Sequence, residues 1–532
     1  MTLSLSLWHW LLALSPVLVV LIMMLGFHSG GGRAGGMGWL AAVLVSILFF
    51  GAGFELLAVA QIKALLLSLD VFYIIWMALL LFHIADEAGA IRMIGRALLG
   101  LTEDRVMQSL LIGWLMVTFI QGTGGFGVPV AVCAPMLVAV GFSPIQAVAM
   151  ASLGDTWAVT FGSLGTSFQT LIAVTGLPAS ELAPYSALLL GIASFPSGML
   201  VAIIGNGWKS FKRALPPVLL LSVVMGGVQY LLATNGLWTL GTTGAGLAGL
   251  VVGLLLLRLP AYSLARTGRN HGEPLAERPP TWDHQDEGKS LWVALISYVL
   301  LVLLAFGVNL IEPVSTFLGQ VRFTLDFPEV TTRYGWITAG GPGRAINIFG
   351  HPGAILLYTC VISLIIYKTV GYLTPGALKR IFTKVTRSGV NSSLGILAMV
   401  GLASIMLHSG MTFLLAEGLS VSISRTFYPL VAPLIGALGA FITGSNTNSN
   451  VLFGALQQNS AQLLKLAPAL ILAAQTAGGS AGSVLAPAKV IVGCSTVGLA
   501  GEEGIVMRKI IGYGLIPIAT IALAAWIIHL IG

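Results

Sequence analysis

The sequence predicts an all-α protein that crosses a lipid membrane many times. Of its 532 residues, 56% are hydrophobic and only 8% are charged, and the mean hydropathy is +0.94. Water-soluble domains carry about 25% charged residues, so this composition excludes them. Two further observations shape the predicted fold: apolar runs of spanning length recur, and two polar interruptions of those runs resemble each other.

Apolar runs of about 20 residues have the length that crosses a bilayer as a helix. The predicted spans are residues 8–27, 37–57, 64–85, 106–120, 182–205, 216–234, 236–257, 290–311, 352–370, 390–408 and 510–531. The first is expected to be a span and not a cleaved signal segment, because it has no basic leader and is too long. Glu55, Lys63 and Asp70 are expected in a solvated loop between the second and third spans.

Basic residues orient these spans, because short basic loops tend to stay in the cytoplasm. The basic residues lie in the clusters 208–213 and 367–387 and at Arg92, Arg96, Arg105, Arg508 and Lys509. Placing all of them inside predicts a plasma (inner) membrane protein with both termini outside. The net charge of +7 is explained by such loops, so nucleic acid is not an expected partner.

The same topology divides the chain into two halves. Residues 1–258 form the N-terminal half, 259–289 a cytoplasmic linker, and 290–532 the C-terminal half. The segment 312–351 falls outside, where its aromatic residues and "GGPG" are expected to build a small cap.

Two regions, 121–178 and 428–497, do not read as plain spans. Each contains a polar break, an apolar helix, a proline and a second polar break. The first pair of breaks is "QGTGGFGVP" and "GDTWAVTFGSLGTS", and the second is "TGSNTNSN" and "QTAGGSAGSVLAPAK". The spacing is the same in both, 30 residues from Gly125 to Asp155 and 30 from Ser445 to Gln475. One copy therefore lies in each half.

Polar breaks at membrane depth need partners, because lipid offers no hydrogen bonds and each unpaired group costs several kcal/mol. Close helix packing through small residues accounts for segments such as 198–205. It accounts poorly for three asparagines within five positions, Asn446, Asn448 and Asn450. Matched interruptions in two halves instead predict a secondary transporter. Exposed N–H groups at half-helix N-termini would attract an anion, with Ser, Thr and Asn side chains adding hydrogen bonds.

The same residues resemble the lactate permease family of proton-coupled carriers for lactate, glycolate and related 2-hydroxy acids. The resemblance covers nearly the whole chain and is carried by "GGFGVPVAVCAPMLVAVGF" (124–142), "VTFGSLGTS" (159–167), "HPG" (351–353) and the segment 448–503. It implies two inverted repeats, each with a re-entrant hairpin and a broken helix, and an elevator-like transport domain moving against a scaffold. The hairpin tips would then lie at 122–125 and 445–449, and the broken helices at 155–165 and 476–483.

Pattern and resemblance together nominate the binding residues. The predicted substrate-binding residues are Gly122, Thr123, Gly124, Gly125, Thr156, Ser445, Asn446, Thr447, Asn448, Gln475, Thr476 and Lys489. Lys489 would pair with a substrate carboxylate, although a lysine reaching to the interface is an alternative. Three positions depart from the family pattern: Asp155 stands where Asn is more common, Ala158 where Pro is more common, and Lys489 where a basic residue is not always found.

Asp155 and His408 are the predicted proton-coupling residues. A charge in the middle of a membrane helix costs about 2.5–3.5 kcal/mol, so Asp155 is a functional candidate by default, with a structural pair to Lys489 as the alternative. His408 can carry protons at physiological pH, although a lone histidine at a helix end is often structural.

The predicted function is import of lactate, glycolate or a similar anion by proton symport. The rival is a sodium-coupled organic-anion carrier of the same architecture. An enzyme is disfavoured because "HEXXH" is absent, and an ATP-driven pump because "GXXXXGK[ST]" is absent. A channel would suit several subunits better than two related breaks in one chain. No cofactor or metal is expected, the three cysteines give no pairing pattern, and a homodimer stays open.

Overall fold

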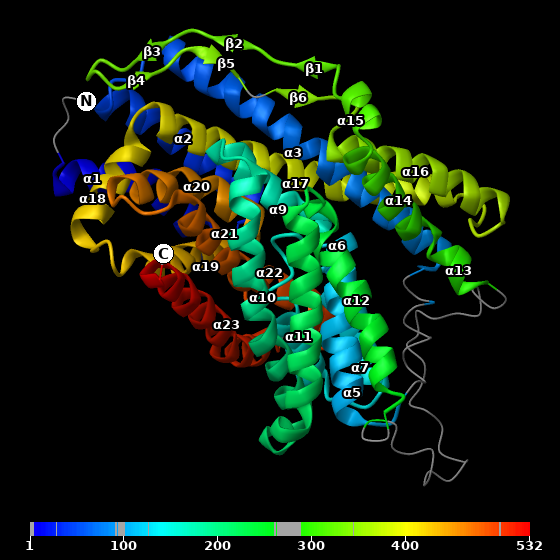
Figure 1. Ribbon diagram of the computed structural model, residues 1–532. Coiled ribbons are helices and arrows are strands. Elements are labelled where there is room, and N and C mark those ends of the chain that lie inside the picture. The colour runs from blue at the N-terminus through cyan, green and yellow to red at the C-terminus, as the bar shows by residue number, and fades with distance from the viewer. Residues whose placement is uncertain are drawn as a thin grey trace.

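The chain is described from a computed structural model, in which helices account for nearly all regular structure (Figure 1). The described residues are 5–27, 29–90, 93, 102–125, 127–259, 262, 289–343, 345–499 and 502–531. Most of the predicted linker 259–289, together with Arg92 and Arg96, lies outside the described residues. Within the described ranges, eleven helical segments are long and apolar enough to cross a membrane.

The first half of the chain contributes twelve of the labelled elements. They are α1 (Leu7–Leu25), α2 (Gly31–Phe49), α3 (Phe54–Ala88), α5 (Arg105–Leu110), the π-helix η1 (Leu111–Met116), α6 (Val117–Thr123), α7 (Val128–Ala139), α8 (Pro144–Gly154), α9 (Gly162–Thr175), α10 (Ala179–Asn206), α11 (Phe211–Thr234) and α12 (Gly241–Leu256). Short 3-10 turns precede α11 at Trp208–Ser210 and α12 at Trp238–Leu240.

The second half begins with α13 (Leu291–Ala294) and α14 (Ile296–Leu310), so the predicted span 290–311 is interrupted by a turn at Leu295. The other helices of this half are α15 (Glu312–Leu318), α16 (Pro352–Thr369), α17 (Ala377–His408), α18 (Met411–Ser422), α19 (Tyr428–Thr443), α20 (Asn446–Leu463), α21 (Pro468–Val484), α22 (Pro487–Thr496) and α23 (Glu503–Ile531). Helix is thus confirmed for most of every predicted span, with ends that shift by several residues.

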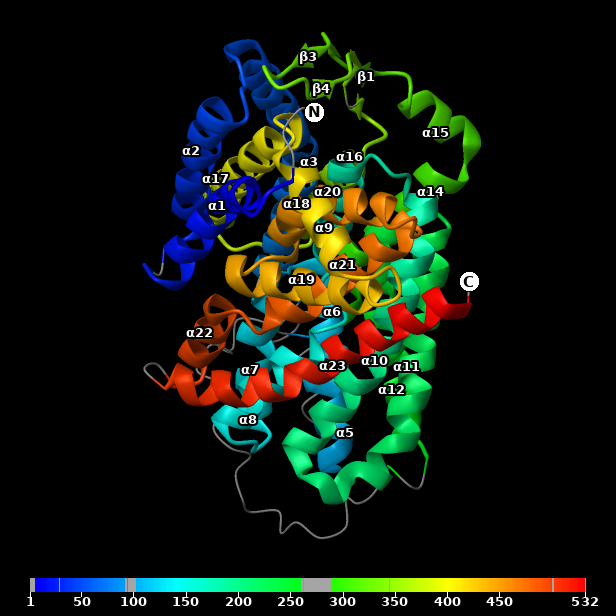
Figure 2. The same cartoon turned by 90° about the vertical axis from the view of Figure 1, so that its left-hand side faces the viewer.

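The segment 312–351 adds strands that the all-α prediction did not include. Three antiparallel strand pairs follow one another along a single long hairpin, which is called the ribbon below. The strands are β1 (Arg322–Phe323), β2 (Asp326–Phe327), β3 (Val330–Thr331), β4 (Ile337–Thr338), β5 (Gly341–Pro342) and β6 (Ile346–Asn347). Phe327 and Val330 are buried against Leu56, Val59 and Leu66 of α3, so the ribbon lies along that helix (Figures 1 and 2).

The expected loop around Glu55, Lys63 and Asp70 is wrong, because α3 runs unbroken from Phe54 to Ala88. The chain turns earlier, at Gly51, whose φ of +67° suits glycine. The three charged residues are spaced seven or more apart in a strongly apolar helix, so they do not interrupt it. Asp70 is buried and finds side-chain partners in place of water.

Each predicted hairpin tip, 122–125 and 445–449, contains part of a tight turn between helices, although Gly122 and Thr123 still belong to α6 and residues 446–449 already belong to α20. α6 ends at Thr123, and α7 starts after a turn in which Gly125 and Gly127 have φ values of +61° and +84°. α19 ends at Thr443, Gly444 adopts the left-handed conformation, and Ser445 caps α20. Glycine at a helix C-terminus takes this conformation at little cost.

The first predicted helix break is confirmed and the second is wrong in position. Residues 155–161 are non-helical, and Ser163, Leu164 and Gly165 all have positive φ. By contrast, α21 continues through 476–483 and the chain breaks only at Leu485 and Ala486. The small residues predicted to break this helix instead let it touch α19: a Cβ on Gly478 would lie 2.0 Å from the Pro433 carbonyl oxygen.

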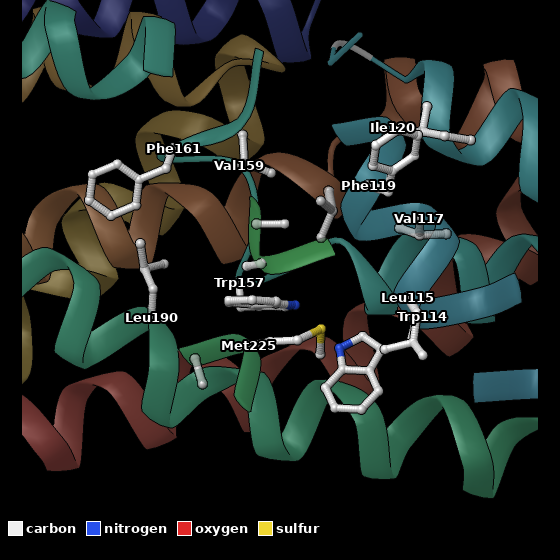
Figure 3. Close-up of a cluster of buried hydrophobic side chains, with 14 of the residues drawn as sticks. Trp114, Leu115, Val117, Phe119, Ile120, Trp157, Val159, Phe161, Leu190 and Met225 are labelled. Atoms are coloured by element: carbon white, nitrogen blue, oxygen red, sulfur yellow. The ribbon is translucent and has the colours of Figure 1, made fainter. Parts of the chain in front are cut away.

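Two fully buried tryptophans lie at the first break. Trp114 of η1 and Trp157 of the break are fully buried, and Figure 3 shows the Met225 side chain of α11 beside both rings. Phe161, at the end of the break, packs near Leu190 of α10 in the same view. The non-helical segment is therefore held inside an apolar core, where each of its polar groups needs a protein partner.

Candidate functional site

A cavity of about 300 Å³ lies where the two hairpin tips approach the first helix break. Its wall combines the two tips (Gln121, Gly124 and residues 443–448), the break (Val159, Ser163, Thr166 and Ser167), Lys489, and parts of α2, α3 and α17. Figure 2 shows α9, α20 and α21 side by side near the centre of the molecule. Segments from both halves of the chain therefore form one pocket.

Four helices present their N-terminal turns to this cavity. Gly31 and Gly32 begin α2, Thr166 and Ser167 begin the regular part of α9, Asn446 to Asn448 begin α20, and Lys489 lies in the first turn of α22. N–H groups in a first turn lack intrahelical acceptors, and each helix N-terminus carries about half a positive charge. The cavity is therefore built to hold negative charge.

Lys489 is the one charged side chain in the described wall of the cavity. It is 4% exposed, and its Nζ donates a hydrogen bond to Ser483 Oγ at 3.2 Å. A cation in the first turn of α22 opposes the helix dipole, and its burial adds a desolvation cost. An anion in the cavity would offset both costs.

Asp155 lies behind this wall, 1% exposed, at the end of α8. With its amide nitrogen turned toward Asp155, the Gln121 side chain donates to both carboxylate oxygens, at 3.3 and 3.2 Å. The charges of Lys489 and Asp155 act on each other, but the two groups form no direct ion pair within 4.0 Å in the described structure. Gln121 thus stands between the carboxylate and the cavity.

Amide and hydroxyl groups tie the start of α20 to α21 and to the first break, around Thr476. Its Oγ1 accepts hydrogen bonds from Asn446 Nδ2 at 3.3 Å and Asn450 Nδ2 at 2.9 Å. Thr160 of the first break donates to the Thr476 carbonyl at 3.0 Å, and Ser167 bonds to Thr447 at 3.0 Å. The last two of these bonds join segments 316 and 280 residues apart, and all four fix the shape of the cavity.

At the start of α20, three buried amide oxygens have no hydrogen-bond partner within the described part of the chain. They are Oδ1 of Asn446, Asn448 and Asn450. Asn446 and Asn448 also line the cavity. A buried acceptor without a donor costs about 1–3 kcal/mol, so a ligand that brings a hydroxyl hydrogen or a cation would stabilise this arrangement.

The cavity contains half of the predicted substrate-binding residues. Gly124, Ser445, Asn446, Thr447, Asn448 and Lys489 line it. The remaining predicted residues support its shape from behind. Gly122 packs against the Thr243 backbone, Thr123 bonds to its own helix, Thr156 bonds to Ser197, Gln475 bonds to Ser449, Gly125 abuts Ser163, and Thr476 holds the asparagines.

His408 lies elsewhere. Its Nδ1 bonds to the Ser404 carbonyl oxygen at 2.8 Å, and the side chain lines a separate cavity beneath the ribbon. Ile396, on the same helix, lines the central cavity, and it lies twelve positions from His408, or about 18 Å at 1.5 Å per residue. The structure therefore does not bring His408 to Asp155.

Several wall residues were not predicted from the sequence. Gln121 opens the motif "QGTGGFGVP", but only the fold turns it toward Asp155. Gly31 and Gly32 come from "SGGGRAGG", which reads as a simple turn. Ser163 has a φ of +49°, unusual for a residue with a side chain, and no sequence signal marks it.

A second buried polar cluster was also missed, at Asp70. Its two oxygens meet His351 Nε2 at 3.0 Å and Gln169 Nε2 at 2.9 Å. His351 caps α16, because its Nδ1 accepts from the Gly353 N–H at 3.1 Å, which leaves Nε2 as the donor to Asp70. The Tyr73 ring stacks on the imidazole at 5.0 Å. The cluster joins α3, α9 and α16.

Comparison with known proteins gives a consistent set of relatives. The sequence model of the L-lactate permease family matches residues 9–532. An L-lactate permease of Halalkalibacterium halodurans is 26% identical over 524 residues, covering 97% of this chain and 96% of that protein. The glycolate permease GlcA of Escherichia coli is 25% identical over 529 residues, covering 95% and 93%. Among solved structures, the YdaH transporter of Alcanivorax borkumensis is similar, with a TM-score of 0.46, 15% identity and coverage of 85% and 84%.

Proposed function

The chain belongs to the L-lactate permease family, and from this premise we propose that it imports a small 2-hydroxy monocarboxylate, such as lactate or glycolate, by proton symport. It is a multi-pass membrane transporter of that family. The observation that carries the proposal is the convergence of four helix N-termini and Lys489 on one cavity.

The chemistry of the wall matches the two functional groups of a 2-hydroxy acid. The carboxylate would bind the Lys489 ammonium and the N–H groups of Asn446 and Thr447 at the start of α20, since Ser445 already accepts the Asn448 N–H. The hydroxyl hydrogen would satisfy Asn446 or Asn448 Oδ1. A volume of about 300 Å³ lies at the small end of ligand cavities, which suits a solute of a few carbons.

Charge balance in the buried site supports coupling to a proton. In the empty site, the Lys489 ammonium and the Asp155 carboxylate compensate each other. When an anionic substrate occupies the cavity, Lys489 compensates the substrate, and a buried carboxylate is then left without a counter-charge. Uptake of one proton by Asp155 restores neutrality, because an isolated buried charge is far more costly than a neutral carboxyl group. One proton would accompany each anion.

The sodium-coupled alternative draws on a different observation. The unpartnered oxygens of Asn446, Asn448 and Asn450 are of the type that binds hard cations. A sodium ion beside Asp155 would keep the loaded site neutral without protonation. The two proposals differ in which ion gradient drives accumulation.

The transport domain would comprise the two hairpins and the two broken helices, moving against a scaffold that includes α2, α3 and α17. The same proposal includes this elevator-like movement and the inverted repeats. It also includes the division of the chain at 259–289 and the position of both termini outside. It is supported by the position of the cavity, whose wall is shared between the hairpin tips and those three helices.

The test is uptake of labelled lactate and glycolate by the full chain in liposomes. A pH gradient and a sodium gradient are imposed separately on wild type, Asp155→Asn and Asp326→Asn, an exposed carboxylate on the ribbon that serves as the control. We expect accumulation driven by the pH gradient in wild type and Asp326→Asn. Asp155→Asn should lose accumulation but keep lactate exchange, because neutral Asn imitates the protonated, loaded state.

Other outcomes discriminate between the alternatives. Accumulation driven only by sodium would favour the sodium-coupled carrier. Proton-driven accumulation that survives in Asp155→Asn would keep the transporter and remove Asp155 from proton coupling. If neither acid moves under either gradient, the substrate assignment is wrong.

A further inference from the structure

A second cavity, of about 230 Å³, lies beneath the ribbon. Its walls are α3, α17, α18 and α20, and its roof is formed by Phe327, Pro342 and Gly343 of the ribbon. The polar side chains that reach it are Lys63, Ser404, His408 and Thr412. The central site does not use any of these four.

The charge in the described wall of this second cavity is positive. Lys63 is the one charged side chain in its described wall, and the Lys63 Nζ lies 5.1 Å from the centre of the Phe327 ring. Lys63 forms no ion pair with a carboxylate within the described residues. Among the described residues, the close partner of this cation is an aromatic face, which leaves the ammonium able to bind an anion.

His408 supplies a complementary group. Its Nδ1 faces the Ser404 carbonyl oxygen at 2.8 Å and so carries the ring hydrogen. In the neutral ring Nε2 is then an acceptor, available to a ligand hydroxyl. Lys63 lies near enough for its charge to act on the imidazole. An ammonium and an acceptor nitrogen in one small cavity match a carboxylate and a hydroxyl on one small molecule.

A third cavity, of about 830 Å³, lies between the other two. It shares Ala64 with the cavity beneath the ribbon, and it shares Gly31 and Gly32 with the central cavity. Arg33 is the charged side chain in its described wall. Three adjoining cavities thus present Lys63, Arg33 and Lys489 in succession, and no Asp or Glu is among the described lining residues of any of them.

We propose that the cavity beneath the ribbon is a second, outer binding site for the transported anion, in which Lys63 binds the carboxylate and His408 accepts the hydroxyl hydrogen. From there the anion reaches the central site through the cavity lined by Arg33. The identity of the ligand as a 2-hydroxy acid rests on the proposed function, whereas the preference for an anion does not. A cavity whose wall carries charges of one sign concentrates solutes of the opposite charge and raises the rate at which they bind.

The test uses single cysteines in the cavity wall to measure whether anionic or cationic reagents enter the cavity. Ala403→Cys places a thiol in the wall of the outer cavity, and Ala64→Cys places one at its junction with the next. The purified full chain is treated with two methanethiosulfonate reagents of similar size, one a sulfonate and one a quaternary ammonium. Native Cys133, Cys360 and Cys494 are buried, so the chain without an added cysteine measures the background.

We expect the sulfonate to react about tenfold faster than the ammonium reagent, after both rates are divided by those with a free thiol. Lactate should slow the sulfonate reaction at Ala403→Cys. Adding Lys63→Gln should abolish most of the preference, whereas Lys212→Gln, at an exposed position that lines none of the three cavities, should leave it unchanged. Equal normalised rates, a preference that survives Lys63→Gln, or thiols that neither reagent reaches would each overturn the proposal.

A transport measurement separates this inference from the proposed function. In lactate uptake, Lys63→Gln should raise KM several-fold and leave the rate at saturating lactate unchanged, because the central site is intact. A loss at saturation would contradict an outer site. If wild type carries no lactate at all, the proposed function fails, while the charge preference of the two cysteines still decides whether the anion site exists.

Discussion

At the residue scale, Lys489 is the side chain on which the central site depends most. It is buried, it lies in a helix turn that disfavours a cation, and Ser483 is its one described hydrogen-bond partner. Lys489→Gln keeps much of the side-chain volume and removes the charge. A hydrogen bond to a charged group contributes about 1.5–3 kcal/mol, so KM for lactate should rise roughly tenfold to a hundredfold. Initial uptake rates over a range of lactate concentrations measure this.

Lys212→Gln is the matched control for this substitution, since Lys212 is exposed and lines none of the three cavities. Its KM should equal that of wild type. Lys489→Arg should recover part of the affinity, because it restores the charge with a different shape. An unchanged KM in Lys489→Gln would show that the lysine does not contact the substrate.

Asp70, whose buried position was not predicted from the sequence, has a structural role that can be tested. Asp70→Leu removes both acceptors and leaves the His351 and Gln169 donors buried and unpaired. Each unpaired group costs about 1–3 kcal/mol, so the midpoint of thermal unfolding in detergent should fall by several degrees. Asp70→Asn keeps one acceptor oxygen and should fall less. If both variants unfold at the wild-type temperature, the cluster does not stabilise the fold.

At the element scale, the contact of α19 with α21 decides the shape of the second hairpin. Gly478 and Gly482 face α19 so closely that a Cβ on either of them would lie 2.2 Å or less from a backbone carbonyl oxygen of α19. Small residues at regular intervals allow helices in membranes to approach in this way. The contact keeps α21 straight through the region that the sequence suggested was broken.

Gly478→Ala tests this packing. The added methyl group would lie 2.0 Å from the Pro433 carbonyl oxygen, so the helices must separate at a cost of about 1–3 kcal/mol. Thermal unfolding in detergent should show a lower midpoint. Gly512→Ala in α23 is the control, since nothing lies within 4 Å of its Cβ position and alanine favours helix. Equal midpoints for the two variants would show that α19 and α21 do not pack this closely.

At the scale of the whole molecule, the sequence predicts the helices well because membrane depth imposes a simple rule. Apolar runs must be helical to satisfy their backbone, so the spans from α1 to α23 could be found from hydropathy. The same rule misplaces charged residues. Asp70 reads as a loop residue, because its partners Gln169 and His351 are 99 and 281 positions away and only the fold brings them together.

The part of the candidate site at the second hairpin tip could be predicted from the sequence, and the other parts less well. "GSNTNSN" is too polar to face lipid, and its first five residues, Gly444 to Asn448, do line the cavity. The contribution of α2 could not be found, because glycines in "SGGGRAGG" carry no chemical signal of their own. Thr476 and Gln475 were correctly associated with the second region, but they hold other side chains and do not face the cavity.

The first helix break has a consequence for the making of the protein. The Val159 N–H and the Thr160 hydroxyl find their acceptors at Ser480 and Thr476, 321 and 316 residues later in the chain. At about 5–20 residues per second, a ribosome needs roughly 16 to 64 s to supply them. During that interval residues 155–161 have no completed set of partners, so the nascent chain depends on water or on the insertion machinery until its second half arrives. The N-terminal half made alone should therefore be a substrate for membrane quality control.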